Sequence, residues 1–272
     1  MAKPKILVLR KMSSLEYYYH NNHPDVSLHE SKENQDVNNK VIEDILRQEG
    51  CEYDIVTREQ IAGWMVEKYD YVFSAGGDGT AIAAAYFNHN KPQLNIKNDP
   101  KSKGALCQHN IADAVRKTLA GDYNIEEWTR QNVFLDGKFI GRPMNETLVG
   151  GKGVKLRSFA RYDMSYSYNG KTTDISLANS GMVIATGTGS TGWKDVFIPF
   201  PKNSREFRIR SSFPDKPEIK VDYVQLKFKG HGGGFCLDCA EELEYDAQRD
   251  SILEIRISES PLKVIIPTGA EK

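Results

Sequence analysis

The stretch YDYVFSAGGDGTAIAAAYF, residues 69–87, decides the fold of this chain. Its apolar run at 71–73 predicts a buried strand, and its alanine-rich end at 81–87 predicts a helix. Between them lies GGDGT, residues 76–80, whose glycines let the backbone turn tightly and come close to a bound group. The helix that follows offers unpaired N–H groups and the positive end of its dipole, which favour phosphate. We therefore predict a phosphoryl-transfer site at this loop.

The carboxylate in the middle of the loop points to a chemical role. Asp78 would repel a phosphate, so it must either hold a metal or take a proton from a hydroxyl. The alternative is a purely structural helix entry, since glycines at such turns are common.

Composition limits the class of protein. The 272 residues, 39% of them hydrophobic, suffice for one large domain or two small ones. The 36 basic and 37 acidic residues nearly cancel, which indicates neither a nucleic-acid partner nor an anionic membrane surface. The chain enters a strand at once, without a signal or transit sequence, and no apolar run approaches the ~20 residues that span a bilayer. These features predict a soluble, cytoplasmic protein.

Strands and helices alternate in the first part of the chain. Expected strands are 5–10, 52–56 and 92–97, and expected helices are 41–49, a segment capped by Thr57 that ends near 68, and 111–120. Residues 11–39 are polar and predict a long surface loop. Alternation of this kind indicates a parallel sheet, in which ligands gather at the carboxyl ends of the strands.

The second part is rich in β-branched and aromatic runs. They lie at 133–135, 159–168, 182–185, 206–210, 221–229 and 252–257. Asp136-Gly137 and Asn169-Gly170 are favoured hairpin turns. We predict a mostly antiparallel β domain that begins near residue 108.

Two polar motifs fall in this β-rich part. Residues 187–192, GTGSTG, fit G-x-G-x-x-G, but no long helix follows, and Trp193 stands where a P-loop has lysine. The segment therefore predicts a loop suited to a sugar or purine, with a plain β-turn as the alternative. Asn145 and Glu146 form an amide–carboxylate pair that can bind adjacent ribose hydroxyls, or they are simply a polar strand end.

The order of these motifs resembles one family. GGDGT at 76–80, Asn-Glu at 145–146 and TGTGSTGW at 186–193 follow one another as in the NAD kinases. Diacylglycerol and sphingosine kinases and phosphofructokinases share the first motif but not this succession. The loop at 95–107 and Ser180-Gly181 are most similar to the divergent branch that contains the animal mitochondrial NAD kinase.

The resemblance implies a two-domain fold, α/β plus all-β. A Rossmann-like (phosphofructokinase-like) α/β domain would comprise residues 1–108 and a returning C-terminal tail, about 255–272. A β-sandwich-like NAD-binding domain would comprise residues 109–254.

The resemblance also implies transfer of the γ-phosphoryl of ATP to the 2′-hydroxyl of the adenosine ribose of NAD. Asp78 would be the general base. Residues expected to bind substrate or nucleotide are Gly76, Gly77, Gly79, Thr80, Asn145, Glu146, Thr188, Ser190, Thr191 and Trp193. Mg²⁺ would be bound mainly through the phosphates of ATP, without protein ligands, and the family implies a homodimer or homotetramer.

This sequence departs from the family pattern at three places. Ser180-Gly181 replaces Asp-Gly, Gly192-Trp193 replaces Ala-Tyr, and residues 238–240 read Asp-Cys-Ala where the family has Asp-Gly-Gln. Two alternatives therefore stay open, a lipid or other small-alcohol kinase that shares only GGDGT, and a non-catalytic NAD(P)-binding regulatory protein. The choices between NAD and NADH and between ATP and polyphosphate also stay open.

Overall fold

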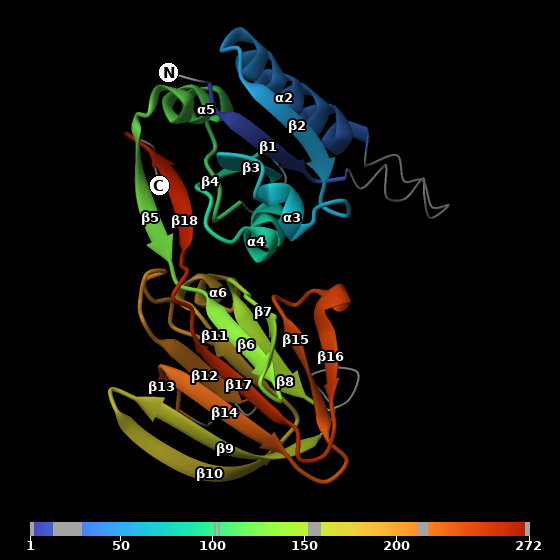
Figure 1. The fold of residues 1–272 in the computed structure, drawn as a ribbon, viewed down its shortest axis with the longest axis vertical. Helices are drawn as coiled ribbons and strands as arrows, with labels where there is room; N and C mark the ends of the chain where they lie inside the picture. The colour runs from blue at the N-terminus through green and yellow to red at the C-terminus, as the bar shows by residue number, and fades with distance from the viewer. Residues whose placement is uncertain are drawn as a thin grey trace. The chain divides into compact units, whose positions relative to one another are not determined.

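The computed structural model describes residues 3–12, 29–100, 102, 104–151, 159–211 and 217–269. The chain forms two compact units, Met1–Glu126 together with Leu262–Lys272, and Glu127–Pro261. The first is a mixed α/β unit and the second is built almost entirely of strands (Figure 1). The predicted combination of an α/β part and a β-rich part is confirmed.

The first unit is organised around a six-stranded sheet, counted over the described residues, with the order β2-β1-β3-β4-β18-β5. The pairings β2–β1, β1–β3, β3–β4 and β4–β18 are parallel. The elements are β1 (Lys5–Arg10), α2 (His29–Gln48), β2 (Glu52–Thr57), α3 (Gly63–Val66), β3 (Tyr71–Gly76), α4 (Asp78–Phe87), β4 (Gln93–Lys97), α5 (Ile111–Ala120), β5 (Tyr123–Trp128) and β18 (Leu262–Pro267).

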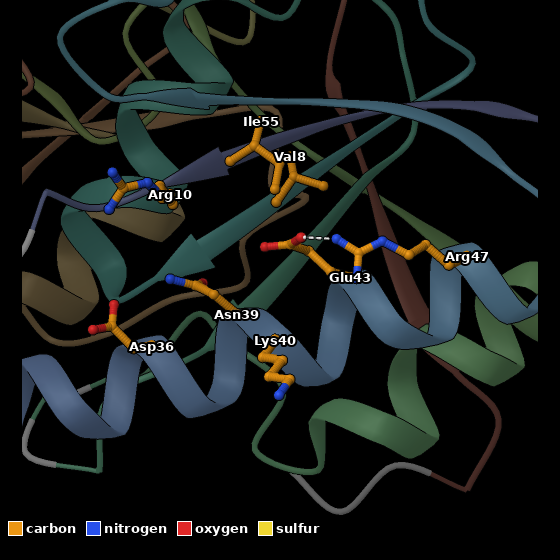
Figure 2. Close-up of a pocket in the computed structure, with 8 residues that line it drawn as sticks. All are labelled: Val8, Arg10, Asp36, Asn39, Lys40, Glu43, Arg47 and Ile55. Atoms are coloured by element: carbon orange, nitrogen blue, oxygen red, sulfur yellow. Dashed lines mark hydrogen bonds and ion pairs between the residues drawn. The ribbon is translucent and has the colours of Figure 1, made fainter.

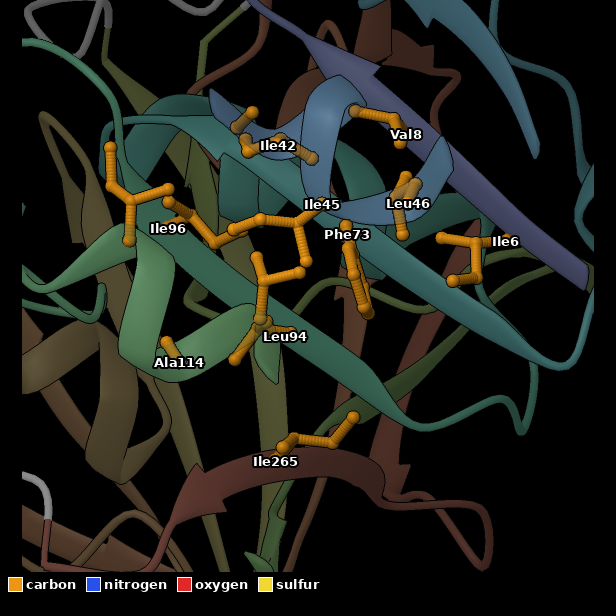
Figure 3. Close-up of a cluster of buried hydrophobic side chains, with 13 residues drawn as sticks. Ile6, Val8, Ile42, Ile45, Leu46, Phe73, Leu94, Ile96, Ala114 and Ile265 are labelled. Atoms are coloured by element: carbon orange, nitrogen blue, oxygen red, sulfur yellow. The ribbon is translucent and has the colours of Figure 1, made fainter. Parts of the chain in front are cut away.

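Helices cover both faces of this sheet. On one face, α2 and α5 bury Ile42, Leu46 and Val115 against Phe73 of β3 and other strand residues. Ile265 of the last strand belongs to the same cluster (Figure 3). On the other face, α3 and α4 pack over the alternate residues of β1 and β3. The strands are apolar on both faces because both faces are covered, as expected of a parallel sheet.

Helix α2 corrects the prediction of a surface loop at residues 11–39, because it begins at His29. Residues 13–28 lie outside the described part. The first turns of α2 lack apolar periodicity, so the sequence did not indicate a helix there. They are held by polar contacts instead: Ser31 Oγ donates to Asp99 at 2.7 Å, and Asn38 Nδ2 donates to the carbonyl of Asn98 at 2.8 Å.

The helix expected from Thr57 to about residue 68 is wrong over most of its length. Thr57 ends β2, and its N–H donates to Gln60 Oε1 at 2.9 Å. Only Gly63–Val66 is helical. The polar turn at 58–60 satisfies its backbone locally, so no longer helix is needed to bury Val66.

The second unit contains two antiparallel sheets, each six-stranded over the described residues. Their orders are β10-β9-β14-β17-β6-β7 and β13-β12-β11-β8-β15-β16. The elements are β6 (Gln131–Leu135), β7 (Lys138–Gly141), β8 (Glu146–Gly150), β9 (Ala160–Tyr168), β10 (Lys171–Asn179), β11 (Met182–Ala185), α6 (Gly187–Gly192), β12 (Phe207–Ser211), β13 (Ile219–Val221), β14 (Tyr223–Phe228), β15 (Gly233–Leu237), the 3₁₀ turn η2 (Glu241–Leu243), β16 (Glu244–Ala247) and β17 (Ile252–Ile257).

Buried side chains join the two sheets. Gln131 of β6 donates to the carbonyl of Ile184 in β11 at 2.7 Å and accepts from Thr147 of β8 at 2.6 Å. The predicted hairpin turns are confirmed, since Asp136 and Asn169 have φ of 49° and 50° and are each followed by a glycine at 78°.

The limits of the two units differ from the predicted boundaries at 108 and 254. Helix α5 belongs to the first unit because Ile111, Ala114 and Val115 lie in its core. Strand β17 belongs to the second unit because it pairs with β14 and β6. The chain enters the first unit again at Leu262, where β18 pairs with β4.

Candidate functional site

The GGDGT loop joins β3 to α4 at the carboxyl edge of the parallel sheet. Gly76 ends the strand, Gly77 is the extended cap residue, and Asp78 is the first residue of the helix. A side chain on Gly76 would lie 2.1 Å from Thr80 Oγ1, so the glycine allows the buried Thr80 to pack against the strand end. The N-terminal N–H groups of a ten-residue helix are therefore presented at this edge.

The carboxylate of Asp78 is held by the turn that follows β4. Its Oδ2 accepts from the N–H of Ala105 at 3.1 Å, and its Oδ1 accepts from the N–H of Leu106 at 2.8 Å. The thiol of Cys107 lies 3.9 Å from Oδ1. Asp78 is half-buried and keeps lone pairs that can accept the proton of a hydroxyl.

Two further side chains, which were not among the predicted site residues, lie beside this loop. A Cβ on Gly77 would lie 3.1 Å from the Cβ of Ser102, and a Cβ on Gly79 would lie 3.8 Å from Arg58 Nη1. Both side chains therefore lie next to the glycines of the loop. The available signal for Arg58 was its position directly after β2, whose carboxyl end shares an edge with that of β3.

In the second unit, Asp238 organises the Asn-Glu segment. Its carboxylate accepts from three successive backbone N–H groups, those of Met144 at 3.1 Å, Asn145 at 2.7 Å and Glu146 at 3.4 Å. Its own N–H donates to the carbonyl of Glu146 at 2.9 Å. From the sequence, Asp238 was noted only as part of a departure from the family pattern. No local pattern indicated that it supports the backbone of the Asn-Glu segment.

Glu146 has a buried carboxyl group. Trp193 Nε1 donates to its Oε2 at 3.1 Å. Burial raises the pKa of Glu146 to about 8, with a further rise from the charge of Asp238 and partial offsets from hydrogen bonds with Cys239 and Trp193. Burial also raises the pKa of Asp238 to about 7, against the three N–H donors and the charge of Arg130. The raised pKa favours the protonated form of Glu146, whose carboxyl can then donate a hydrogen bond.

The segment expected as a loop at 187–192 is a short helix, α6. Thr186 caps it by accepting from the N–H of Gly189 at 3.1 Å, and its hydroxyl donates to the carbonyl of Met144 at 2.6 Å. A Cβ on Gly189 would lie 2.2 Å from the carbonyl oxygen of Asn145. These contacts bring α6 directly against the Asn-Glu segment, and the glycine allows that approach.

The hydroxyls of α6 have different surroundings. Ser190 Oγ donates to Gly187 at 2.7 Å and accepts from the N–H of Phe200 at 3.2 Å, and Thr191 donates to the carbonyl of Thr188 at 2.8 Å. Ser190 is fully buried, and its hydroxyl links α6 to the backbone at Phe200.

By contrast, Thr188 Oγ1 of α6 and Asn145 Oδ1 are among the buried side-chain oxygens that have no hydrogen-bond partner in the described part of the chain. Buried polar atoms are normally satisfied, so unpaired ones on neighbouring segments indicate a place for a polar ligand.

A pocket of about 450 Å³ lies elsewhere in the first unit, between α2 and the strands β1 and β2 (Figure 2). Val8 and Ile55 form its apolar floor, and Glu43 and Arg47 are ion-paired on its α2 side. None of the predicted site residues lines it.

The predicted residues thus fall into two groups. Asp78 and the surrounding glycines and Thr80 lie together in the first unit, and Asn145, Glu146, Trp193 and the α6 residues lie together in the second. Among the described residues, no group of three or more His, Cys, Asp or Glu side chains is placed to hold a metal ion. Over the same residues, no helix is both long and apolar enough to cross a membrane.

Fold and site together define a class of two-unit proteins. An open parallel sheet bears a glycine-rich loop with a central carboxylate, and an antiparallel unit carries an Asn-Glu segment beside a Gly-Ser-Thr helix. No family model matches the chain.

Comparison with known proteins relates the chain to the NAD kinases. It is 24% identical over 214 residues to the NAD kinase of Chloroherpeton thalassium, and this alignment covers 74% of each of the two chains. It is 33% identical over 105 residues to the human mitochondrial NAD kinase 2, covering 36% of this chain and 24% of that one. The structure of an Archaeoglobus fulgidus NAD kinase in complex with ATP superposes with a TM-score of 0.66 at 16% identity, covering 97% of this chain and 94% of that one. The resemblance to the NAD kinase family is confirmed, and the human match agrees with the divergent branch.

Proposed function

We propose that this chain is an NAD kinase, which transfers the γ-phosphoryl group of ATP to the 2′-hydroxyl of the adenosine ribose of NAD. The observation that carries the proposal is the placement of Asp78. Asp78 begins α4, where phosphate is favoured, and its carboxylate is oriented by the N–H groups of Ala105 and Leu106. Relatives named NAD kinase align over most of the chain and support the choice of substrate.

In the proposed reaction Asp78 takes the proton of the 2′-hydroxyl. The hydroxyl oxygen attacks the γ-phosphorus, the bond to the β–γ bridging oxygen breaks, and ADP leaves. Gly76, Gly77, Gly79 and Thr80 would surround the phosphates, and Arg58 and Ser102 would add a cation and a hydroxyl. Such transfers depend on positioning and on offsetting negative charge, which these groups supply.

The second unit would bind NAD. Asn145 Oδ1 and Thr188 Oγ1 are buried oxygens of this unit that lack hydrogen-bond donors, and ribose hydroxyls are suitable donors. Glu146 would hold a ribose oxygen through its neutral carboxyl, and Trp193 would offer a flat apolar surface to adenine. Thr191 would lie at the edge of the base, whereas Ser190 would act by keeping α6 in place.

Mg²⁺ would enter with ATP. The ion is held by phosphate oxygens and offsets their charge during transfer. We further propose that the protein is cytoplasmic and acts as a homodimer or homotetramer. Light scattering after size-exclusion chromatography measures the number of subunits.

The test is direct. Purified protein is incubated with ATP, Mg²⁺ and NAD, and NADP is detected with an NADP-specific dehydrogenase. NADH as acceptor and polyphosphate as donor are run in parallel. We expect NADP from ATP and NAD. Calorimetric binding of NAD without any product would identify a non-catalytic NAD-binding protein. If no NADP forms and NAD does not bind, lipids and other small alcohols should be tested as acceptors.

A further inference from the structure

The turn at residues 104–107 lies directly against Asp78, and its backbone donates hydrogen bonds to the Asp78 carboxylate. It is closed by a hydrogen bond from the N–H of Cys107 to the carbonyl of Gly104 at 3.1 Å. The two central N–H groups, of Ala105 and Leu106, both donate to the Asp78 carboxylate, one to each oxygen. Successive N–H groups that converge in this way form a concave site for an anion.

The turn is itself fixed to the sheet. Gln108 donates to the carbonyl of Asn95 at 2.7 Å and accepts from the N–H of Lys97 at 2.9 Å, which makes a parallel bridge to β4. On the other side, the N–H of Asn98 donates to the carbonyl of Gly76 at 3.0 Å. The N–H donors and the start of α4 are thus tied to the same sheet edge, so the carboxylate has one defined orientation.

Gly104 makes this turn possible. Its φ is +61°, a left-handed conformation that other residues adopt at a cost. A Cβ at this position would also lie 2.7 Å from the Cδ of Lys97. A side chain at 104 therefore displaces either the Lys97 side chain or the turn that carries the two N–H groups.

We propose that the turn at 104–107 is the positioning element of the Asp78 carboxylate, and that it acts on the chemical step and not on substrate binding. This inference rests on the proposed function in one respect, since its kinetic consequence requires NADP formation. Asp78 contacts the reacting hydroxyl, whereas Gly104, Ala105 and Leu106 act only through Asp78.

The kinetic test compares Gly104→Ala with Gly121→Ala. Gly121 also has a left-handed conformation, with φ +77°, but its Cβ would meet nothing within 4 Å. Both variants bear the backbone cost, so we expect both to melt somewhat below the wild type. Only Gly104→Ala should lose kcat, by about 10- to 100-fold with KM for NAD and ATP within about twofold, because a misplaced catalytic group lowers the rate of reaction. Equal kcat in the two variants would overturn the proposal.

A second measurement needs no enzymatic activity. Hydrogen exchange of the Ala105 and Leu106 amides is followed in the wild type, in Asp78→Ala, and in the control Asp44→Ala, which removes a surface carboxylate of α2. We expect at least about tenfold faster exchange in Asp78→Ala alone, because the two amides lose their acceptor. Unchanged exchange in this variant would overturn the proposal even for an active kinase. If exchange is faster in Asp78→Ala but the wild-type protein makes no NADP, the contact between the turn and Asp78 is established and only the proposed function is overturned.

Discussion

Two aspartates in this molecule are bound by successive backbone N–H groups, yet they serve different ends. Asp78, in the first unit, is half-buried and is held by two N–H groups of one turn. Asp238, in the second unit, is also half-buried, but its carboxyl accepts from three N–H groups and lies near Glu146 and Arg130. An oriented carboxylate that stays partly exposed is available to a substrate hydroxyl. One whose oxygens accept from three backbone N–H groups holds that backbone in place.

Burial changes the titration of the two acids in the second arrangement. It raises the pKa of Asp238 to about 7 and that of Glu146 to about 8, because each charged form loses its hydration. The N–H donors offset part of that penalty. The comparison therefore predicts that changes at Asp78 affect catalysis, whereas changes at Asp238 and Glu146 affect NAD binding and stability.

The largest expected effect comes from Asp78→Asn. The amide keeps the shape of the side chain but cannot take a proton, so kcat should fall by at least about 100-fold. The amide leaves one of the two backbone N–H groups without an acceptor, so the midpoint of thermal unfolding should fall slightly, whereas the affinity for NAD, measured by calorimetry, should stay close to wild type. Activity within a few-fold of wild type would remove Asp78 from the role of base.

Asp238→Asn should show the opposite pattern. Its amide offers one oxygen and places a donor against backbone N–H groups, so the Asn-Glu segment loses part of its support. We expect the Kd for NAD to rise about tenfold and the free energy of unfolding to fall by about 1–3 kcal/mol. The matched control is Asp222→Asn, whose carboxylate accepts from Ser167 Oγ and the N–H of Asn169. A larger effect in the control would contradict the role given to Asp238.

The acid pair also predicts a pH dependence of stability. The native state keeps protons on Glu146 and Asp238 up to about pH 8 and 7, whereas their unperturbed values are 4.5 and 3.8. In between, the native state binds more protons than the unfolded chain. The free energy of unfolding should therefore fall as the pH rises from about 5 to about 8, by up to about 1.4 kcal/mol per pH unit for each proton.

Urea unfolding at several pH values measures this slope. Glu146→Gln should flatten it, because one of the two titrating groups is gone. Glu43→Gln, which removes a surface partner of Arg47, should leave it as in wild type. A slope in Glu146→Gln as steep as in wild type would show that other groups cause it.

Trp193→Phe should have the smallest effect. It removes the N–H that donates to Glu146 at 3.1 Å but keeps an aromatic surface. We expect a stability loss of about 1 kcal/mol and a rise of a few-fold in KM for NAD, with kcat little changed. Trp64→Phe, at a side chain that is 65% exposed in the first unit, is the control and should change neither value.

Local patterns predicted much of the fold. The strands Lys5–Arg10 and Met182–Ala185 and the helix Ile111–Ala120 agree with the sequence to the residue. Each has a continuous apolar run or a clear helical period, with a stop signal at Gly121 for the helix. Helix α2 was only half predicted, since its N-terminal turns depend on contacts with Asn98 and Asp99 that a local pattern does not contain.

The site divides in the same way. Asp78 could be singled out because a carboxylate among glycines at a helix start opposes phosphate binding, which points to a role in proton transfer or metal binding. Asp238 could not, because its three N–H partners lie more than 90 residues away in the chain. Ser190 was singled out as a hydroxyl in a Gly-Ser-Thr segment, and its contact with a ligand stays a prediction; the structure adds its hydrogen bonds with Gly187 and Phe200, which the sequence did not indicate.

By itself the sequence determined the strand–GGDGT–helix unit, the change from α/β to β texture, and the succession of motifs that relates the chain to the NAD kinases. These follow from periodicity, glycine conformations and helix-start chemistry, which act over a few residues. Only the tertiary structure decided that the last strand pairs beside β4, that the turn at 104–107 orients Asp78, and that Asp238 holds the Asn-Glu segment. Hydrogen bonds between segments far apart in the chain depend on where the fold places each donor, and no local pattern carries that information.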